Sequence, residues 1–182
     1  MPKIFKTQDG FTLIEIISVL VVLGLLVAVV VSRMTNYDTE VRMGTDVLKE
    51  HLRYAQTKAM NKDPNTEKDP DNNYTKTVME IKYDAVDNKY WLFVGIDEST
   101  IITLPDDSKY VTSGLKIDLA AKKIKFNSGF TIYFDDHGIP YTAYTSSTVN
   151  TPLASALTIV VTALSGGSAS SVTITPLTGF IQ

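Results

Sequence analysis

The sequence predicts an α+β protein, in which one long N-terminal helix packs on a C-terminal antiparallel β-sheet or sandwich domain. Three observations predict it. The 21 residues from Phe11 to Val31 carry one charge and would span about 30 Å as a helix. An amphipathic helical pattern follows them. From residue 77 onward, short apolar segments alternate with turn residues, as in antiparallel sheets.

The composition excludes several classes of protein. The 182 residues suffice for one domain and a short additional element. The absence of cysteine excludes disulfides, thiolate zinc sites and iron–sulfur clusters, and His51 and His137 are too few for a multi-histidine metal centre. A net charge of −3 gives no basic footprint of the kind that nucleic-acid binders carry. We therefore expect no cofactor, no metal and no nucleic-acid partner.

The apolar block admits more than one interpretation. Lys3 and Lys6 precede it and Arg33 follows it, so the charge rule alone is ambiguous, and the short basic leader favours a cytoplasmic location for its own end. A secretory signal peptide would need a small-residue cleavage site after the block, and Ala28 and Ser32 offer only a weak one. A plain signal anchor leaves Glu15 unexplained, because a carboxylate inside an apolar span costs about 2.5–3.5 kcal/mol.

The residues around this carboxylate give a third interpretation. The segment GFTLIE, residues 10–15, resembles the processing site of type IV pilins and type II secretion pseudopilins. The resemblance implies that prepilin peptidase cuts after Gly10 and methylates Phe11, while the apolar helix stays on the product. Glu15 is then implied to act in assembly, since it can meet the new amine of a neighbouring subunit, and each charge is penalised without the other.

Gly24 lies within the apolar block. Major pilins often have a helix-weakening glycine and then a proline in this segment, whereas here Ser32 stands about where the proline would be. Gly24 therefore either weakens the helix or allows close helix packing, and the sequence leaves both roles open.

The helix is expected to continue to about Asn61 as an amphipathic helix that docks on the globular domain. His51 and Tyr54 lie on the shoulder of its apolar face, so we expect His51 to be a boundary residue and not a ligand. The apolar face is predicted from positions at helical spacing, which are Val41, Leu48, Leu52, Ala55 and Ala59.

These patterns divide the chain into four segments. Residues 1–10 form the prepilin leader, and 11–32 form the transmembrane or filament-core helix. Residues 33–62 form the amphipathic helix, and 63–182 form a periplasmic β-rich domain.

A polar, proline-containing loop is expected at residues 61–76. Oxygen-bearing side chains at its alternate positions are of the kind that binds calcium, but it has two prolines and no central turn glycine, which favours a solvated loop. These side chains are Asp63, Asn65, Glu67, Asp69, Asp71 and Asn73.

The rest of the chain is predicted as strands and turns, with the first two strands forming a hairpin. Trp91 is expected in a strand core with one aromatic edge exposed. The strand candidates begin at Thr77 and continue with 89–96, 101–104, 115–119, 124–126, 130–134, 141–144, 157–163 and 171–176.

No catalytic constellation is found in the sequence. Residues 135–138, Asp-Asp-His-Gly, bring carboxylates beside a histidine, but neighbours on a tight turn rarely converge on one substrate. Phosphate-binding glycine loops and a GxSxG element are absent. We therefore expect a protein that is not an enzyme.

A second resemblance concerns the C-terminal half. Phe134, Gly138, Pro140, Thr178 and Gly179 follow a pattern similar to that of the H-type minor pseudopilins and their FimT-like relatives. It implies a structural minor subunit of a type II secretion pseudopilus or type IV pilus, which supports protein secretion across the outer membrane.

The implied location is the bacterial inner membrane, with one membrane-spanning helix and the C-terminal domain in the periplasm. The implied partners are other pilin or pseudopilin subunits, prepilin peptidase, the inner-membrane assembly platform and the inner membrane itself.

The alternative is a membrane-anchored binder, such as a minor pilin that binds DNA or an adhesion target. Some FimT-like relatives bind DNA through basic C-terminal residues, and residues 175–182 have none. Processing would leave 15 basic and 19 acidic residues, which gives phosphate binding little support. A small basic face could still bind phosphate, although a solvated strand-turn surface is the simpler interpretation. This face consists of Lys116, Lys122, Lys123 and Lys125.

Overall fold

A computed structural model describes residues 11–61, 78–95, 101–105, 115–146 and 148–182, with the side chains of 32–38 outside this description. The chain divides into two compact units, Met1–Asn36 and Tyr37–Gln182, which are described separately below. The candidate calcium loop at 61–76 falls almost entirely outside the described residues.

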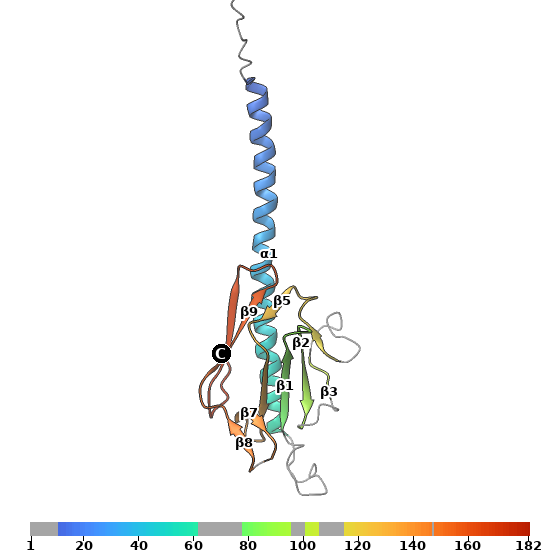
Figure 1. Ribbon diagram of the computed structural model, residues 1–182, viewed down its shortest axis with the longest axis vertical. Coiled ribbons are helices and arrows are strands. Elements are labelled where there is room, and N and C mark those ends of the chain that lie inside the picture. Colours follow the sequence, from blue (N-terminus) through green and yellow to red (C-terminus); the bar gives the residue numbers. More distant parts are fainter. Residues whose placement is uncertain (1–10, 62–77, 96–100, 106–114, 147) are drawn as a thin grey trace, which may run out of the picture. The chain divides into compact units, whose positions relative to one another are not determined.

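The α+β prediction is confirmed. Helix α1 spans Leu13–Met60, close to the predicted 11–61 (Figure 1). The described strands are β1 (Met79–Asp84), β2 (Lys89–Val94), β3 (Ile101–Ile102), β4 (Ile117–Asp118), β5 (Ile124–Phe126), β6 (Phe130–Phe134), β7 (Pro140–Tyr144), β8 (Asn150–Pro152), β9 (Leu157–Ala163) and β10 (Ala169–Ile174).

The strands form two antiparallel sheets. The larger has the order β3-β2-β1-β6-β7-β8, with β4 also pairing with β2. The predicted hairpin is present, since β1 and β2 pair from Met79↔Val94 to Asp84↔Lys89. The smaller sheet has the order β10-β9-β5.

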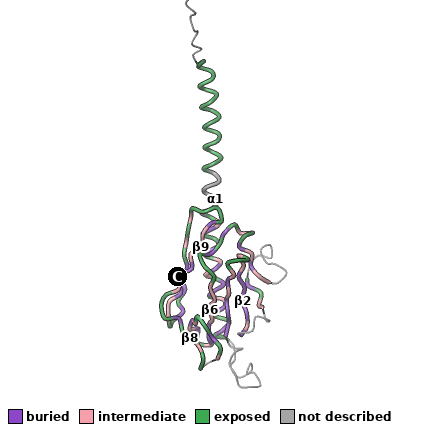
Figure 2. Tube along the Cα trace, in the orientation of Figure 1, coloured by how far each residue is buried: buried purple, intermediate pink, exposed green. Residues whose placement is uncertain are grey.

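The C-terminal half of α1 packs against both sheets and forms the core of the second unit. All five residues of its predicted apolar face are at most 1% exposed. Figure 2 shows that buried residues lie in the interior of the domain. Gly44 lies against the side chain of Ile124 on β5, so this glycine lets the helix approach the smaller sheet closely.

The prediction that His51 is a boundary residue is wrong, because its side chain is fully buried. Its Nε2 donates to the carbonyl oxygen of Pro105 at 3.1 Å, and its Nδ1 lies 2.7 Å from the hydroxyl of Tyr90. Periodicity placed this residue at the edge of the helix face, but β2 and the segment ending at Pro105 cover that edge. A polar ring is tolerated there because both nitrogens have partners.

The face of the larger sheet that points away from α1 is also partly covered. Glu80, which alternates with apolar residues on β1, is only 3% exposed. Trp91 is 4% exposed, so the predicted exposed aromatic edge is largely covered. The ammonium of Lys116 lies 3.8 Å from the centroid of its ring, a cation–π contact.

Several strand boundaries differ from the prediction. β3 and β4 are two residues long, and β10 ends at Ile174. β8 lies in the Ser/Thr-rich stretch 145–152, which is not among the strand candidates given above. It pairs with β7 at the edge of the sheet, where Pro152 needs no further ladder hydrogen bond.

We expect the Leu48→Ala variant to lose about 2–5 kcal/mol of unfolding free energy, because Leu48 is fully buried and truncation leaves a cavity. Met43→Ala on the same helix is the control, since Met43 is 62% exposed and should change stability by less than about 0.5 kcal/mol. Denaturation of the full chain in detergent, followed by the fluorescence of the single tryptophan, measures both. Equal losses would contradict the packing described here.

Candidate functional site

The N-terminus of α1 is capped by Thr12. The backbone N–H of Glu15 donates to Thr12 Oγ1 at 3.3 Å and to the Thr12 carbonyl oxygen at 3.1 Å. Thr12 followed three residues later by Glu15 has the spacing of a capping box, a signal that the sequence prediction did not use. The carboxylate of Glu15 also lies in the first helical turn, where the helix dipole favours negative charge.

The first turns of α1 bury no side chain within the chain. Phe11, Leu13 and Ile14 are 81%, 77% and 71% exposed. The helix from Leu13 to Val31 has a mean hydropathy of 3.1 and is long and apolar enough to cross a membrane. An apolar surface of this extent is stable only when lipid or another protein covers it.

The polar side chains of this segment differ in how they are satisfied. Ser18 Oγ donates to the Ile14 carbonyl oxygen at 2.8 Å, so its hydroxyl is tolerated in an apolar environment. Glu15 is exposed, and it is the one ionisable side chain of Leu13–Val31. Gly10, the predicted cleavage position, lies outside the described residues.

Gly24 does not interrupt the helix, which continues through it to Met60. A side chain built at Gly24 would meet no atom within 4 Å. Its small size therefore has no packing role inside the chain, and a role in contact with another helix stays a prediction.

The Asp135–Gly138 segment is a turn, as predicted. The carboxylate of Asp135 holds this turn together. Asp135 Oδ1 accepts the backbone N–H groups of His137 at 3.0 Å and Ile139 at 2.8 Å. Asp135 Oδ2 accepts the hydroxyl of Tyr141 at 2.9 Å. The ligand atoms of Asp135, Asp136 and His137 lie within 4.8 Å of one another. Because three hydrogen bonds already occupy Asp135, this cluster has little capacity left to coordinate a metal.

Two residues of the C-terminal resemblance, Gly138 and Gly179, meet near the end of α1. Gln56 Nε2 donates to the carbonyl oxygen of Gly138 at 2.9 Å and to that of Gly179 at 3.2 Å. Arg53 Nη2 donates to the carbonyl oxygen of Ile181 at 2.9 Å. The two glycines have φ values of +75° and +61°, which favour glycine. They therefore join the helix, the turn after β6 and the C-terminal segment, and their role here is structural.

The basic face is already engaged in part. Lys123 Nζ lies 3.3 Å from Glu40 Oε1, and Lys116 covers Trp91. These contacts are consistent with a solvated, structural surface more than with a phosphate-binding one.

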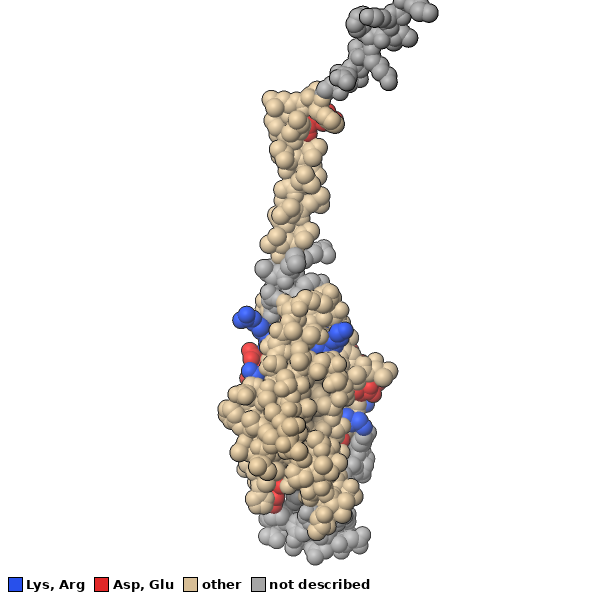
Figure 3. Space-filling model, turned by 60° about the vertical axis from the view of Figure 1, so that its left-hand side comes forward, with Lys and Arg blue, Asp and Glu red and all other residues tan. Residues whose placement is uncertain are grey.

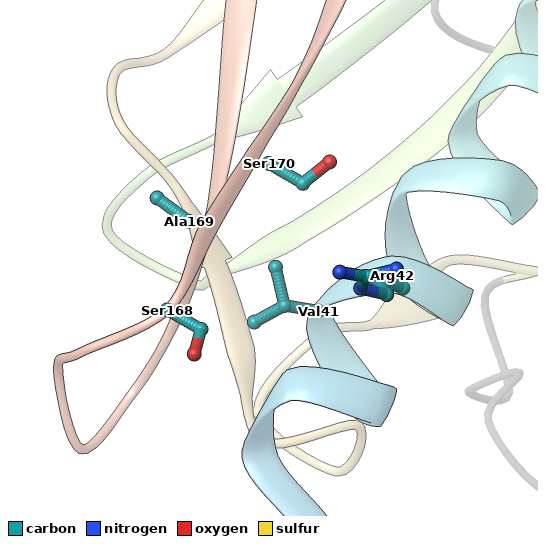
Figure 4. A pocket seen from close by; sticks show the side chains of 5 residues that line it. All are labelled: Val41, Arg42, Ser168, Ala169 and Ser170. Carbon is teal, nitrogen blue, oxygen red and sulfur yellow. The ribbon is translucent and has the colours of Figure 1, made fainter. Parts of the chain in front are cut away.

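A pocket of about 360 Å³ lies between α1 and the start of β10 (Figure 4). Val41 and Arg42 contribute from the helix, and residues 168–170 contribute two serines and an alanine from the hairpin. Arg42 is exposed, and the described lining of this pocket contains no carboxylate and no histidine that could activate its two serines.

Comparison with known proteins identifies the N-terminal segment. Residues 5–31 match the family model of the prokaryotic N-terminal methylation motif. No curated protein and no solved structure matches the chain. The match covers Gly10, Phe11 and Glu15 together with the apolar helix, and it supports the pilin and pseudopilin class, with processing by prepilin peptidase and assembly with other pilins.

We expect Gly179→Ala to lose about 2–5 kcal/mol of unfolding free energy, because its Cβ would lie 2.5 Å from both Gln56 Nε2 and the Gly138 carbonyl oxygen, at a φ of +61°. Gly166→Ala is the matched control. Gly166 has a φ of +80° but no atom within 4 Å of the new Cβ, so only backbone strain of about 1–2 kcal/mol applies. Denaturation of both variants measures the difference, and a larger loss at Gly166 would be the opposite of the expected result.

A second prediction concerns alkaline pH. Burial, followed by the hydrogen bond to Asp135 and its negative charge, raises the pKa of Tyr141 well above the usual 10.0. Since the folded state holds the phenol proton more tightly than the unfolded state, this contribution to stability is complete below pH 10 and is lost as pH rises above it. The unfolding free energy of Tyr141→Phe should therefore fall less steeply above pH 10 than that of the wild type.

The check is a series of denaturation curves between pH 8 and pH 12. At pH 8 the variant should already be less stable by about 1 kcal/mol, because it lacks the hydroxyl that donates to Asp135. If the unfolding free energies of the wild type and the variant fall equally steeply above pH 10, Tyr141 does not have the expected proton linkage.

Proposed function

We propose that this chain is a structural minor subunit of a type II secretion pseudopilus or a type IV pilus, and that it is not an enzyme. The observation that carries the proposal is the methylation motif at residues 5–31 joined to an apolar helix, Leu13–Val31, that covers nothing within its own chain. In the proposed pathway, prepilin peptidase cleaves after Gly10 and methylates Phe11. The subunit then assembles through its N-terminal helix and supports protein secretion across the outer membrane.

The exposed apolar helix supports assembly in two steps. In the membrane, lipid covers the side chains of Leu13–Val31, and in a filament the helices of neighbouring subunits would replace lipid. Both environments are apolar, so transfer between them changes little hydrophobic free energy. A specific interaction is then needed to select the filament and its register.

Glu15 is suited to that selection. Cleavage creates a positive amine at Phe11, and a carboxylate in an apolar environment is strongly penalised until a cation neutralises it. The Thr12 cap orders the backbone at the start of the helix, which fixes the direction in which Glu15 projects. A pair between Glu15 of one subunit and the amine of its neighbour forms only in one relative register, and this gives assembly its specificity.

The proposal includes a location and a subtype. The location is the inner membrane, crossed once, and the basic residues before the apolar helix favour an orientation with the leader in the cytoplasm and the C-terminal domain in the periplasm. The pattern Phe134, Gly138, Pro140, Thr178 and Gly179 supports the H-type, FimT-like subtype. Assembly would require the other subunits and the inner-membrane platform of the machine.

We expect Glu15→Leu to insert and to be processed at Phe11, but to enter filaments at least about tenfold less than wild type, because the neighbouring amine stays unpaired. Ser18→Ala is the control in the same span, since the Ser18 hydroxyl bonds only to its own helix. The measurements are the mass of the mature N-terminus and the subunit content of sheared filaments. An intact Met1 in the membrane fraction, or normal assembly of Glu15→Leu, would refute the proposal.

A further inference from the structure

The C-terminal quarter of the chain lacks charge to an unusual extent. Residues 138–182 contain no Asp, Glu, Lys, Arg or His. At the 20% charged content of the whole chain, about nine charged residues would be expected there. Exposed surfaces of soluble domains normally carry charges of both signs, so a surface made from this segment requires an explanation.

The pairing register places much of this segment on one face of the smaller sheet. Ile159, Val161 and Val172 are at most 1% exposed and point toward α1. Their neighbours on β9 and β10 therefore point outward, since successive residues of a strand alternate between faces. These outward residues are Thr158, Val160, Thr162, Ser171 and Thr173.

The C-terminal residues widen this face. Ile181 pairs with Ile174, and both are buried. The N–H of Gln182 donates to the Thr173 carbonyl oxygen at 3.1 Å, and the N–H of Thr175 donates to the Phe180 carbonyl oxygen at 2.9 Å. Phe180, one position from Ile181, therefore points outward beside Thr175, and it is 59% exposed. We name the outward surface of β9, β10 and residues 175–182 the uncharged face.

The pictures agree with this assignment. The C-terminal strands, drawn in red, lie on the left of the domain in Figure 1. Figure 3 turns that side forward and shows a surface that is tan over most of its area, with the charged groups toward its margins.

At one corner of the uncharged face, the exposed apolar side chain of Leu177 is held by a strained backbone. Leu177 has a φ of +64° and is 71% exposed. Leucine in this region of backbone space is strained, and its side chain recovers nothing by burial within the chain. Hydrogen bonds hold the loop in place, including the 2.7 Å bond between the hydroxyls of Thr175 and Thr178. Leu177 and Phe180 are thus displayed on a fixed loop, as aromatic and apolar anchors of interfaces are.

We propose that the uncharged face is the contact surface for a second copy of this chain, paired face to face. Two identical copies of net charge −3 repel each other, and the described side chains of this face add no like charges to that repulsion, with Lys125 of β5 at its margin beside Thr162. The inference rests on the proposed function in one respect. Copies anchored in one membrane share an orientation, so a two-fold axis along the membrane normal can relate two of them and bring the same face of each together.

The absence of cysteine makes the test direct, because any disulfide must come from an introduced residue. Ser171→Cys places a thiol on the exposed part of β10 in the full chain, in its native membrane. Val86→Cys is the control, since Val86 is 93% exposed and lies between Asp84 and Asp87, outside the uncharged face. After mild oxidation, Ser171→Cys should give disulfide-linked homodimers and Val86→Cys should give few.

A second pair of variants tests the charge argument. Thr158→Lys, added to Ser171→Cys, places two lysines of a dimer on facing surfaces, so the dimer fraction should fall at least about tenfold. Val86→Lys in the same background should leave it unchanged. Unchanged thermal unfolding, followed by Trp91 fluorescence, shows that each variant is folded.

Equal crosslinking at Ser171 and Val86, no crosslinking at Ser171, or crosslinking only to a different protein would each overturn the pairing with a second copy. The mature N-terminus and the filament content of the same samples report on the proposed function separately. Normal processing and assembly without the Ser171 dimer would refute this inference and leave the filament role intact.

Discussion

The structure depends on one helix that meets two different environments. The apolar side chains of α1 from Leu13 to Val31 are exposed, which is unfavourable in water. The apolar face from Val41 to Ala59 is instead buried against the sheets. A single backbone element therefore links a segment that needs an external partner to a domain that has its own core. Glu15 and its Thr12 cap lie at the beginning of the first segment, where an unpaired charge has the greatest energetic effect.

The other end of the helix organises the C-terminal part of the fold. Gln56 and Arg53 donate to three carbonyl groups on segments that are about 80 to 130 residues away in sequence. Gly138 and Gly179 are close enough to the helix that a side chain at either would be crowded. The C-terminal residues are thereby fixed against β10, and the neighbouring loop can hold Leu177 in a strained conformation. The same contacts that close the domain thus shape the surface proposed for self-association.

The distribution of charge supports the proposal that the protein acts through contacts with other macromolecules. Among the described residues, the carboxylate–histidine cluster at 135–137 is occupied by turn and tyrosine hydrogen bonds, and two of the four lysines of the basic face contact Glu40 or Trp91. The distinctive surfaces are instead the apolar helix surface of Leu13–Val31, with its one carboxylate, and the uncharged face, whose described residues carry no charged side chain. Both are surfaces whose free energy falls when another macromolecule covers them.

The sequence by itself determined the long helix, its apolar face from Val41 to Ala59, the β1–β2 hairpin and the pilin-like N-terminus, because these depend on local periodicity and on a contiguous motif. It did not determine that His51 is buried, that Glu80 lies on a covered sheet face, or that Gly138 and Gly179 meet at Gln56. Those features depend on which strands cover the edge of the helix and how distant segments approach one another. Local patterns contain no information on such contacts, so only the tertiary structure decided them.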